Sequence, residues 1–481
     1  MNREFYRMLD RLNVRKLLSM LCVITFFTSC SQAGNRGELI DSTQDTTQVQ
    51  TTLSESMTAE HSTTEPIPED DVLAGKAWIT SDVAEQNGVL TVETDEVVVS
   101  YVFSSDSRGM AGGEITVGNN TGKRHSVSLW WGNAKGRLSS YSSLGEFMVA
   151  AGKESTLAIH PMTMVPPTAD RFLVVTENEI IVLLLAEERL FDGKLLYTFA
   201  CGSDIHMKGQ KLWNAAMFLK EYDISVFASA GDLTQSSSET TAESDREFSE
   251  ILYTAKLAFG EIPFYSTKGN HDLWVSDSLW GETFETDSPL FYAKEIEGDL
   301  FVFIGMEGVT DPFVDGALDW LEELLKNNTD KRIYIFQHLF LIDTVSSLRG
   351  AQGQLLYPNV ILMQTTNPEE IRFRSLINAY PNAIHFSGHS HWQYRLQRFD
   401  ENANIYRENE ISGTMVHIGS LGRPLTSDGI STRQEVHAEA SEGMIVEVYD
   451  DCLIIKGIDF ETMEFLSYAC YLVPMTLDTS P

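Results

Sequence analysis

The sequence predicts a protein with two folded parts, an all-β sandwich followed by an α/β domain. From residue 72 to about 190, short and often alternating apolar runs such as "GVLTVETDEVVVSYVF" are separated by clusters of Gly, Asn, Ser and Pro. This pattern is typical of antiparallel strands in a β-sandwich. From about residue 193 to 475, β-branched and aromatic runs alternate with amphipathic stretches such as "QKLWNAAMFLKEY". This second pattern indicates α/β layers around a buried sheet.

The first thirty residues have the pattern of an export signal. A start with more basic than acidic residues precedes "LLSMLCVITFF", an apolar stretch too short to span a bilayer as a mature helix. The following "FTSC" resembles a bacterial lipoprotein cleavage box, which predicts lipidation of Cys30. Phe27 departs from the usual Leu of that box, so ordinary signal cleavage nearby is the alternative. We therefore expect a chain that is lipid-anchored to the outer face of the bacterial cell membrane, with secretion as the alternative.

Acidic residues dominate the composition. The chain has 69 acidic and 35 basic side chains, for a formal net charge of -34. Such a chain should be repelled by nucleic acid and by anionic lipid headgroups, so we expect no nucleic-acid partner and no membrane contact except through the lipid. Residues 31–71 are rich in Thr, Ser, Gln and acids, which predicts a disordered linker. The composition gives no indication of the oligomeric state.

The predicted sandwich, residues 72–190, has the pattern of fibronectin type III or immunoglobulin-like domains and shows no group of side chains suited to chemistry. Trp130 and Trp131 are neighbours on one predicted strand, so one should point into the core and the other outward. The outward one could bind carbohydrate, but we favour plain packing.

Three of the five cysteines remain after Cys22 is removed with the signal and Cys30 is lipidated. This odd number does not suggest a disulfide framework. Cys452 and Cys470 could pair, but we favour three buried thiols that pack as small hydrophobic side chains.

Polar side chains follow five of the first six predicted strands of the α/β domain. In such sheets, ligands gather beyond the carboxyl ends of the strands, so these side chains should lie close together. Carboxylates, an amide oxygen and imidazoles without Cys suit Mn, Fe, Zn or Ni. Seven ligands are too many for one tetrahedral ion and suit a pair of ions with one shared carboxylate. The candidates are Asp204, His206, Asp232, Asn270, His338, His389 and His391.

The ordered blocks D-x-H, G-D, G-N-H-[DE], H and G-H-x-H, over roughly residues 195 to 460, resemble the signature of the calcineurin-like metallophosphoesterases. The resemblance implies a four-layer α/β/β/α sandwich and the hydrolysis of phosphate esters. It implies that Asp204, His206 and His391 hold one divalent metal ion. Asn270, His338 and His389 would hold the other, and Asp232 would bridge the two. Several families of secreted phosphoesterases also carry a β-sandwich ahead of the catalytic domain.

Two ions about 3.5 to 4 Å apart acidify a shared water, which supplies a metal-bound hydroxide as nucleophile at neutral pH. The leaving oxygen needs a proton donor, and the resemblance makes His271 the candidate general acid. We expect Asp272 to orient His271 and to favour its protonated form.

Two branches of the family are disfavoured. Purple acid phosphatases have a Tyr three residues after the bridging Asp, where this chain has Gln235, and a Gly in place of His206. Secreted 5'-nucleotidases append a large C-terminal domain, whereas only 90 residues follow His391.

The leading hypothesis is a cell-surface metallophosphoesterase that cleaves phosphate mono- or diesters. The alternative is a catalytically weak surface protein that binds a partner through its β-sandwich. Substrate and metal identity do not follow from the sequence.

Overall fold

The computed structural model describes residues 71–80, 88–104, 108–235, 240–308, 312–341, 344–345, 367–395, 404–427, 434–475 and 477. The predicted signal, Cys30 and nearly all of the predicted linker lie outside these residues. Residues from Gly75 onward belong to one compact unit. Within the described residues, no helix is both long and apolar enough to cross a membrane.

Residues 77–184 form two β-sheets that pack face to face. Strand β3 (Val97–Phe103) alternates buried and more exposed residues, as a strand with one face on a core requires. Stacked rings fill the space between the sheets, since Phe172 lies 4.6 Å from both Tyr101 and Trp131, measured between ring centroids. One sheet contains β1 (Ala77–Thr80), β5 (His125–Asn133), β6 (Gly136–Arg137), β7 (Gly145–Val149), β9 (Arg171–Val175) and β10 (Glu179–Leu184), and the other contains β2 (Val89–Glu93), β3, β4 (Gly113–Asn119) and β8 (Glu154–Ile159).

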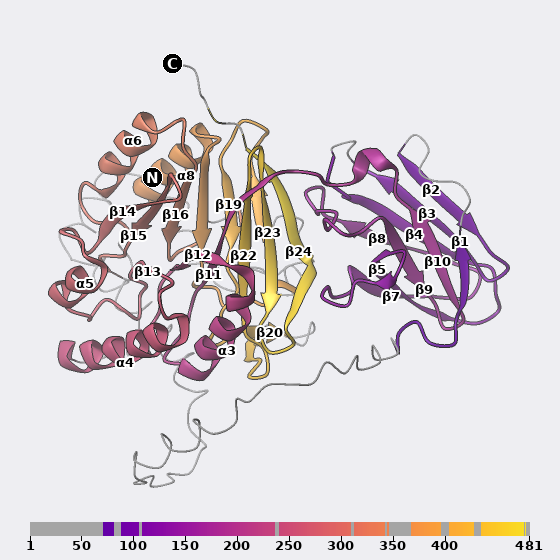
Figure 1. The fold of residues 1–481 in the computed structure, drawn as a ribbon, viewed down its shortest axis with the longest axis horizontal. Coiled ribbons are helices and arrows are strands. Elements are labelled where there is room, and N and C mark those ends of the chain that lie inside the picture. The colour runs from indigo at the N-terminus through magenta and orange to yellow at the C-terminus, as the bar shows by residue number, and fades with distance from the viewer. Residues whose placement is uncertain are drawn as a thin grey trace, which may run out of the picture. The chain divides into compact units, whose positions relative to one another are not determined.

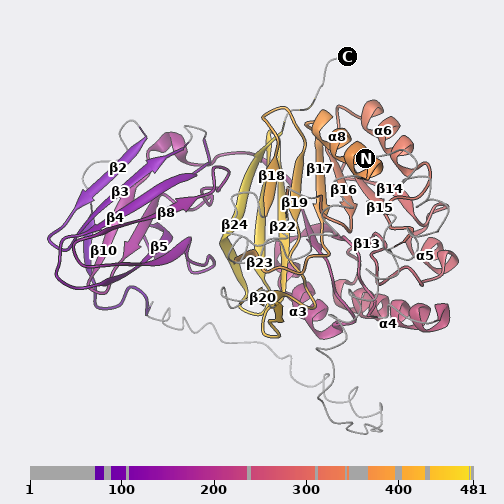
Figure 2. The same ribbon diagram turned by 180° about the vertical axis from the view of Figure 1, so that it is seen from behind.

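Two six-stranded sheets form the centre of the second part (Figure 1). The first has the order β13-β12-β11-β22-β23-β24, from β11 (Leu195–Gly202), β12 (Ile224–Ser229), β13 (Phe264–Ser266), β22 (Glu442–Tyr449), β23 (Cys452–Asp459) and β24 (Glu464–Pro474). The second has the order β14-β15-β16-β17-β19-β18, from β14 (Phe291–Ile296), β15 (Asp299–Ile304), β16 (Ile333–Gln337), β17 (Ala383–Ser387), β18 (Ile405–Arg407) and β19 (Thr414–His417). Figure 2 shows β16, β17, β19 and β18 side by side. A short hairpin of β20 (Leu425–Ser427) and β21 (Gln434–Val436) follows β19.

Aromatic side chains pack the two central sheets against each other. Phe199 of the first sheet contacts Phe301 and Tyr334 of the second, with ring centroids 5.0 and 4.7 Å apart. Such buried rings contribute much of the packing energy of a core.

Helices cover the outer faces of both sheets and complete four layers. On the first sheet, Phe259 at the end of α4 contacts Phe227 of β12. On the second, Leu321 of α6 and Phe373 of α8 share a separate hydrophobic core with Val302 of β15. The helices are α3 (Gly209–Leu219), α4 (Thr241–Phe259), α5 (Asp277–Phe284), α6 (Ala317–Asn327) and α8 (Pro368–Ala379), with short 3-10 helices η1 (Glu187–Arg189) and η2 (Lys220–Tyr222).

Strand β24 lies at the edge of the first sheet and is covered by two segments of the preceding β-rich part. Ser142 N donates to Phe465 O, and Phe465 N donates to Ser140 O. Met164 N donates to Cys470 O further along the strand. Because an unpaired edge strand is a template for aggregation, these contacts protect the sheet.

A buried ion pair ties the two central sheets together. Asp299 Oδ2 of β15 lies 3.5 Å from Arg332 Nη1 and accepts a hydrogen bond from Tyr197 OH of β11 at 2.6 Å. Arg332 Nη2 also donates to the Tyr449 carbonyl of β22 at 2.6 Å. The pair therefore joins strands of both sheets.

The fold class predicted from the sequence is confirmed: a four-layer α/β/β/α domain follows a region of many strands that pack as a β-sandwich. Trp131 is buried and Trp130 is half-buried under the guanidinium of Arg137. Cys201, Cys452 and Cys470 are free and buried. The predicted domain limits, 72–190 and 193–475, stay predictions.

We expect Arg332→Leu to lower the free energy of unfolding by about 3–5 kcal/mol, because it leaves the Asp299 carboxylate buried without its cation. Denaturant unfolding followed by tryptophan fluorescence measures this. The matched control is Arg372→Leu, which removes a half-buried surface guanidinium paired with Asp319 and Glu322 and should cost less than about 1 kcal/mol. Equal losses in the two variants would contradict a structural role for the buried pair.

Candidate metal centre

Parallel strands of both sheets end at the site and deliver its side chains. β11, β12 and β13 are parallel neighbours, as are β15, β16, β17 and β19. The loop after each of five of these strands supplies predicted ligands. They are Asp204 and His206 after β11, Asp232 after β12, Asn270 after β13, His338 after β16, and His389 and His391 after β17.

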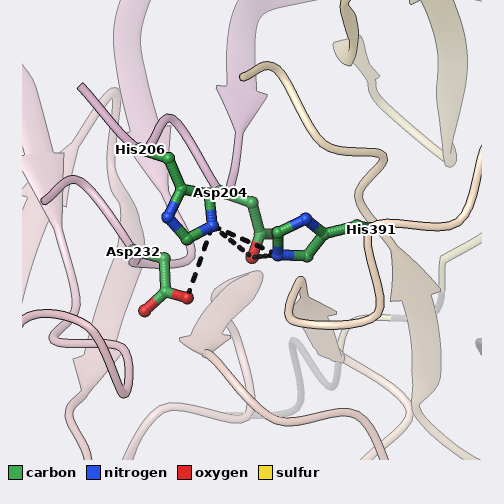
Figure 3. Close-up of side chains that lie close together, drawn as sticks. All are labelled: Asp204, His206, Asp232 and His391. Carbon is green, nitrogen blue, oxygen red and sulfur yellow. Dashed lines mark hydrogen bonds and ion pairs between the residues drawn. The ribbon is translucent and has the colours of Figure 1, made fainter. Parts of the chain in front are cut away.

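The first cluster contains Asp204, His206, Asp232 and His391 (Figure 3). The Nε2 atoms of His206 and His391 lie 3.2 Å apart. His391 Nε2 lies 3.0 Å from Asp204 Oδ1, and His206 Nε2 lies 3.7 Å from Asp232 Oδ2. Four donor atoms from three loops thus converge on one point.

The second cluster contains Asp232, His338 and His389 and also includes Asn270. His338 Nε2 lies 3.0 Å from Asn270 Oδ1, 3.1 Å from His389 Nδ1 and 3.3 Å from Asp232 Oδ2. The same oxygen, Asp232 Oδ2, therefore faces both clusters. The structure brings all seven predicted ligands together, in the two groups that the resemblance implies.

These donor atoms fit divalent metal ions. With metal to ligand distances of about 2.0–2.2 Å, neighbouring ligand atoms of one ion lie roughly 2.8–3.6 Å apart, which matches most of the separations. Asp204 Oδ1 is buried, and the neighbouring His391 Nε2 at 3.0 Å does not donate to it, because His391 carries its proton on Nδ1. The Nε2 atoms of His206 and His391 face each other at 3.2 Å, and their lone pairs repel unless a proton or a cation lies between them. A cation satisfies these atoms.

Hydrogen bonds from the far side of the imidazoles fix their orientation. His338 Nδ1 donates to the Ala230 carbonyl at 2.8 Å, and His391 Nδ1 donates to the Arg423 carbonyl at 3.1 Å. A carbonyl only accepts, so the proton sits on Nδ1 and the Nε2 lone pair points into the site. Such outer partners tune and orient metal-binding histidines.

The two carboxylates each divide their oxygens between the site and the backbone. Asp204 Oδ2 accepts from His389 N at 3.0 Å, and Asp232 Oδ1 accepts from His271 N at 2.8 Å. This leaves Asp204 Oδ1 and Asp232 Oδ2 for the clusters.

The backbone of the site adopts an uncommon conformation. Five of the seven predicted ligands have positive φ, between 46° and 68°: Asp204, His206, Asp232, His389 and His391. Residues other than glycine visit this region rarely, and such residues gather at functional sites. At Gly388 a Cβ atom would lie 1.9 Å from Ser203 Oγ, so only glycine permits the two ligand loops to approach.

Burial and mutual charge set the protonation of the clustered side chains. Burial opposes ionisation of Asp232, but His338 and His271 outweigh it and hold the pKa of this carboxyl well below its usual range. Burial likewise disfavours a charge on His338, but the facing Asp232 raises its pKa to about 9. Burial, together with His338, lowers the pKa of His389 to about 3. The facing Asp232 carboxylate thus favours positive charge at this point of the second cluster.

His271 lies against the first cluster. Its ring centroid is 4.7 Å from that of His206. Its Nδ1 donates to the Gln235 carbonyl at 3.0 Å, so the proton on that side is held and Nε2 is the atom that can give or take one. Gln235 N in turn donates to Glu247 Oε2 at 3.0 Å, which holds this peptide in place.

The expected role of Asp272 needs correction. Its carboxylate is buried and accepts from the backbone N–H groups of Thr234, Leu233 and Gly269 at 3.0 to 3.3 Å. The hydrogen-bond partner of His271 Nδ1 is the Gln235 carbonyl, so Gln235 orients the imidazole in place of Asp272. Asp272 instead links the loop after β12 to the loop after β13. Its short side chain lies within hydrogen-bond distance of the Leu233 and Thr234 N–H groups of the first loop. Burial and the nearby Asp232 carboxylate raise the pKa of Asp272, against the effect of these N–H donors.

The sequence reasoning missed the loop after β19. Leu421 N donates to Ser203 O and Gly422 N donates to Asp204 O, so residues 420–423 support the first cluster. The available signal was the "GSLGRP" at the end of the predicted strand "TMVHIGS", a Gly-rich loop at the same sheet edge as the ligands.

Comparison with known proteins identifies the domain. Residues 197–393, which contain all seven predicted ligands, match the family model of the calcineurin-like phosphoesterases. Among solved structures, a dimetal phosphatase from Danio rerio is similar at 11% identity and a TM-score of 0.40, over 59% of this chain and 100% of that chain. A purple acid phosphatase from yellow lupin (Lupinus luteus) is similar at 12% identity and a TM-score of 0.38, over 80% of this chain and 73% of that chain. A comparison with curated protein sequences found no match.

The family model, and not these distant structures, supports the assignment. Residues 197–393 form a calcineurin-like phosphoesterase domain, which supports a hydrolase that acts on phosphate esters.

Proposed function

We propose that the protein hydrolyses phosphate mono- or diesters with a dinuclear centre of divalent metal ions. The observation that carries this proposal is the pair of clusters that share Asp232 Oδ2. One ion would be held by Asp204, His206 and His391, the other by Asn270, His338 and His389, with Asp232 between them. When bound, the two ions supply a water-derived nucleophile and neutralise the phosphoryl oxygens.

The side chains of this chain set up the remaining steps. The Ala230 and Arg423 carbonyls orient His338 and His391 before any ion arrives, so little reorganisation is needed. His271 presents Nε2 beside the first cluster, where it can protonate the leaving oxygen. The Gln235 carbonyl keeps the other ring nitrogen occupied and prevents the ring from turning.

We also propose that the enzyme works at the cell surface, attached by a lipid at Cys30. The support is the basic start, apolar stretch and "FTSC" box of residues 1–30, which lie outside the described residues.

The metal centre can be tested with the parent protein and Asp232→Asn. We expect the parent to bind about two divalent ions per chain and to hydrolyse p-nitrophenyl phosphate or its bis-ester with Mn²⁺. Asp232→Asn should lower kcat by more than about 100-fold, because changes to outer-shell partners alone cost about 10–100-fold. Asp319→Asn, on the exposed surface of α6, is the control and should match the parent. Fewer than about one bound ion and no turnover with any divalent metal would favour the alternative of a binding protein.

The general acid can be tested by the dependence on the leaving group. His271→Gln should lower kcat for an alkyl phosphate by about 10²–10⁴-fold, because its alkoxide needs a proton. The loss for p-nitrophenyl phosphate should be much smaller, because p-nitrophenolate leaves without one. A loss of equal size for both substrates would contradict the role of His271 as acid. Metal content, measured on the same samples, separates this outcome from damage to the neighbouring Asn270.

The predicted lipid anchor can be tested in the producing bacterium. Cys30→Ala should abolish the incorporation of labelled fatty acid into the protein, because the thiol of Cys30 is the predicted attachment point. Autoradiography of the immunoprecipitated protein measures this, with Cys201→Ala as a control that should stay labelled. Equal labelling of Cys30→Ala and the parent, or no label in the parent, would rule out this anchor.

A further inference from the structure

We infer that Arg423 binds a terminal oxygen of the substrate phosphate and adapts the centre to phosphate monoesters over diesters. This inference rests on the proposed function and adds to it the substrate class. It comes from the loop after β19, whose backbone touches the metal centre and whose one arginine has no side-chain partner among the described residues.

The backbone of Arg423 is held rigidly beside the first cluster. Its carbonyl accepts from His391 Nδ1 at 3.1 Å, and its N–H donates to Ser420 Oγ at 2.9 Å. Ser420 Oγ also donates to the Asp204 carbonyl at 3.1 Å. The backbone of Arg423 is therefore connected to His391 directly and to Asp204 through the Ser420 hydroxyl.

Neighbouring contacts make the loop itself rigid. Gly422 N donates to the Asp204 carbonyl at 3.0 Å, and a Cβ atom on Gly422 would lie 2.1 Å from the Ile205 carbonyl oxygen. Ser441 Oγ donates to the Leu421 carbonyl at 2.9 Å from just before β22. The position of Arg423 is thus set by the same backbone that sets Asp204.

The guanidinium of Arg423 has no such partner. The side chain is half-buried, and no hydrogen bond, ion pair or ring contact to it exists among the residues that the structure describes. Every other described arginine that is buried or half-buried has one. These are Arg137 and Arg189 on aromatic rings, and Arg171, Arg332, Arg372, Arg374 and Arg407 on carboxylates or carbonyls.

An unpaired and partly desolvated arginine is costly, and it is unexpected in a chain with 69 acidic side chains. Guanidinium matches the oxygens of phosphate with two parallel N–H donors, and it cannot lose its charge. The carbonyl of Arg423 accepts from the predicted ligand His391 at 3.1 Å, so the whole side chain starts within one arginine length of the first cluster. An anionic substrate is the partner that the site lacks.

The charge of the centre points to monoesters. Two divalent cations held against the carboxylates of Asp204 and Asp232 would leave a net positive site, and Arg423 adds one more positive charge. A monoester dianion has one terminal oxygen and one negative charge more than a diester. That extra oxygen and charge are what a third cation beside two metal ions can hold.

The test compares two substrates on one preparation. We expect Arg423→Ala to lower kcat/KM for p-nitrophenyl phosphate by about 10–100-fold, as the loss of a charge-assisted hydrogen bond predicts. The loss for bis-p-nitrophenyl phosphate should be no more than about fivefold, as for a weak charge interaction. Arg423→Lys keeps the positive charge but lacks the two parallel N–H donors of guanidinium. Its kcat/KM for p-nitrophenyl phosphate should lie between those of Arg423→Ala and the parent. A partial loss of metal or fold lowers both rates and cancels in the ratio.

Arg246→Ala is the matched control, because it removes one exposed arginine of α4 and changes the net charge equally. It should leave both rates and their ratio unchanged. An unchanged monoester to diester ratio in Arg423→Ala would overturn the inference.

Binding of inorganic phosphate, measured by calorimetry on metal-loaded protein, separates the two proposals. Arg423→Ala should weaken phosphate binding by about 10–100-fold relative to the parent. If the parent cleaves neither ester, the proposed function fails, and phosphate binding alone decides the role of Arg423. Equal phosphate affinity of parent and variant would overturn that role.

Discussion

The Asp232 carboxylate is the interaction on which the rest of the site depends. Its Oδ2 faces His206 of one cluster at 3.7 Å and His338 of the other at 3.3 Å. Its Oδ1 accepts from His271 N, so the same side chain also places the proposed acid. A buried carboxylate is unfavourable unless it is paired and hydrogen-bonded, and here the surrounding imidazoles and N–H groups supply that compensation. One residue therefore connects both clusters to the proposed proton donor.

The two-sheet architecture explains how seven side chains from distant parts of the chain can meet. The parallel strands of each sheet end at one edge, and Ser203 of the first sheet pairs with Ser420 beyond the end of the second. The gap there is small enough that Gly388 has no room for a side chain. The aromatic layer around Phe199 packs the two sheets face to face and so fixes the spacing of the strands that carry the two clusters. Packing energy in the core thus offsets the strain of the positive φ values at the ligands.

Sequence patterns were sufficient for the α/β class and for the set of candidate ligands, because both depend on local periodicity and on the residues directly after each strand. The four layers and the division of the ligands into two groups came from the family resemblance. Local patterns do not by themselves indicate helix α5 or strand β24. Helix α5 is only eight residues long and contains Gly281, and β24 has a mixed pattern that becomes buried only through its neighbours. The residue that accepts the hydrogen bond from His271 Nδ1 also could not be predicted from the neighbouring sequence. The nearest carboxylate in the sequence, Asp272, is used by backbone N–H groups, whereas Gln235 acts through its main-chain carbonyl, which any residue type could provide.

The loop after β19 shows that a site of this kind includes more than the candidate metal ligands, because backbone groups that orient those ligands also belong to it. None of its side chains belongs to the two clusters, yet its Ser420 hydroxyl, its N–H groups and the Arg423 carbonyl fix Asp204 and His391. Any residue type can supply a main-chain carbonyl that orients an imidazole, so this role does not restrict the side chain at that position. The same loop can therefore hold the metal ligands with its backbone and leave its side chains free to meet substrate. In a chain of net charge -34, attraction of an anion must come from local positive groups, and the half-buried arginine on this loop is placed for that purpose.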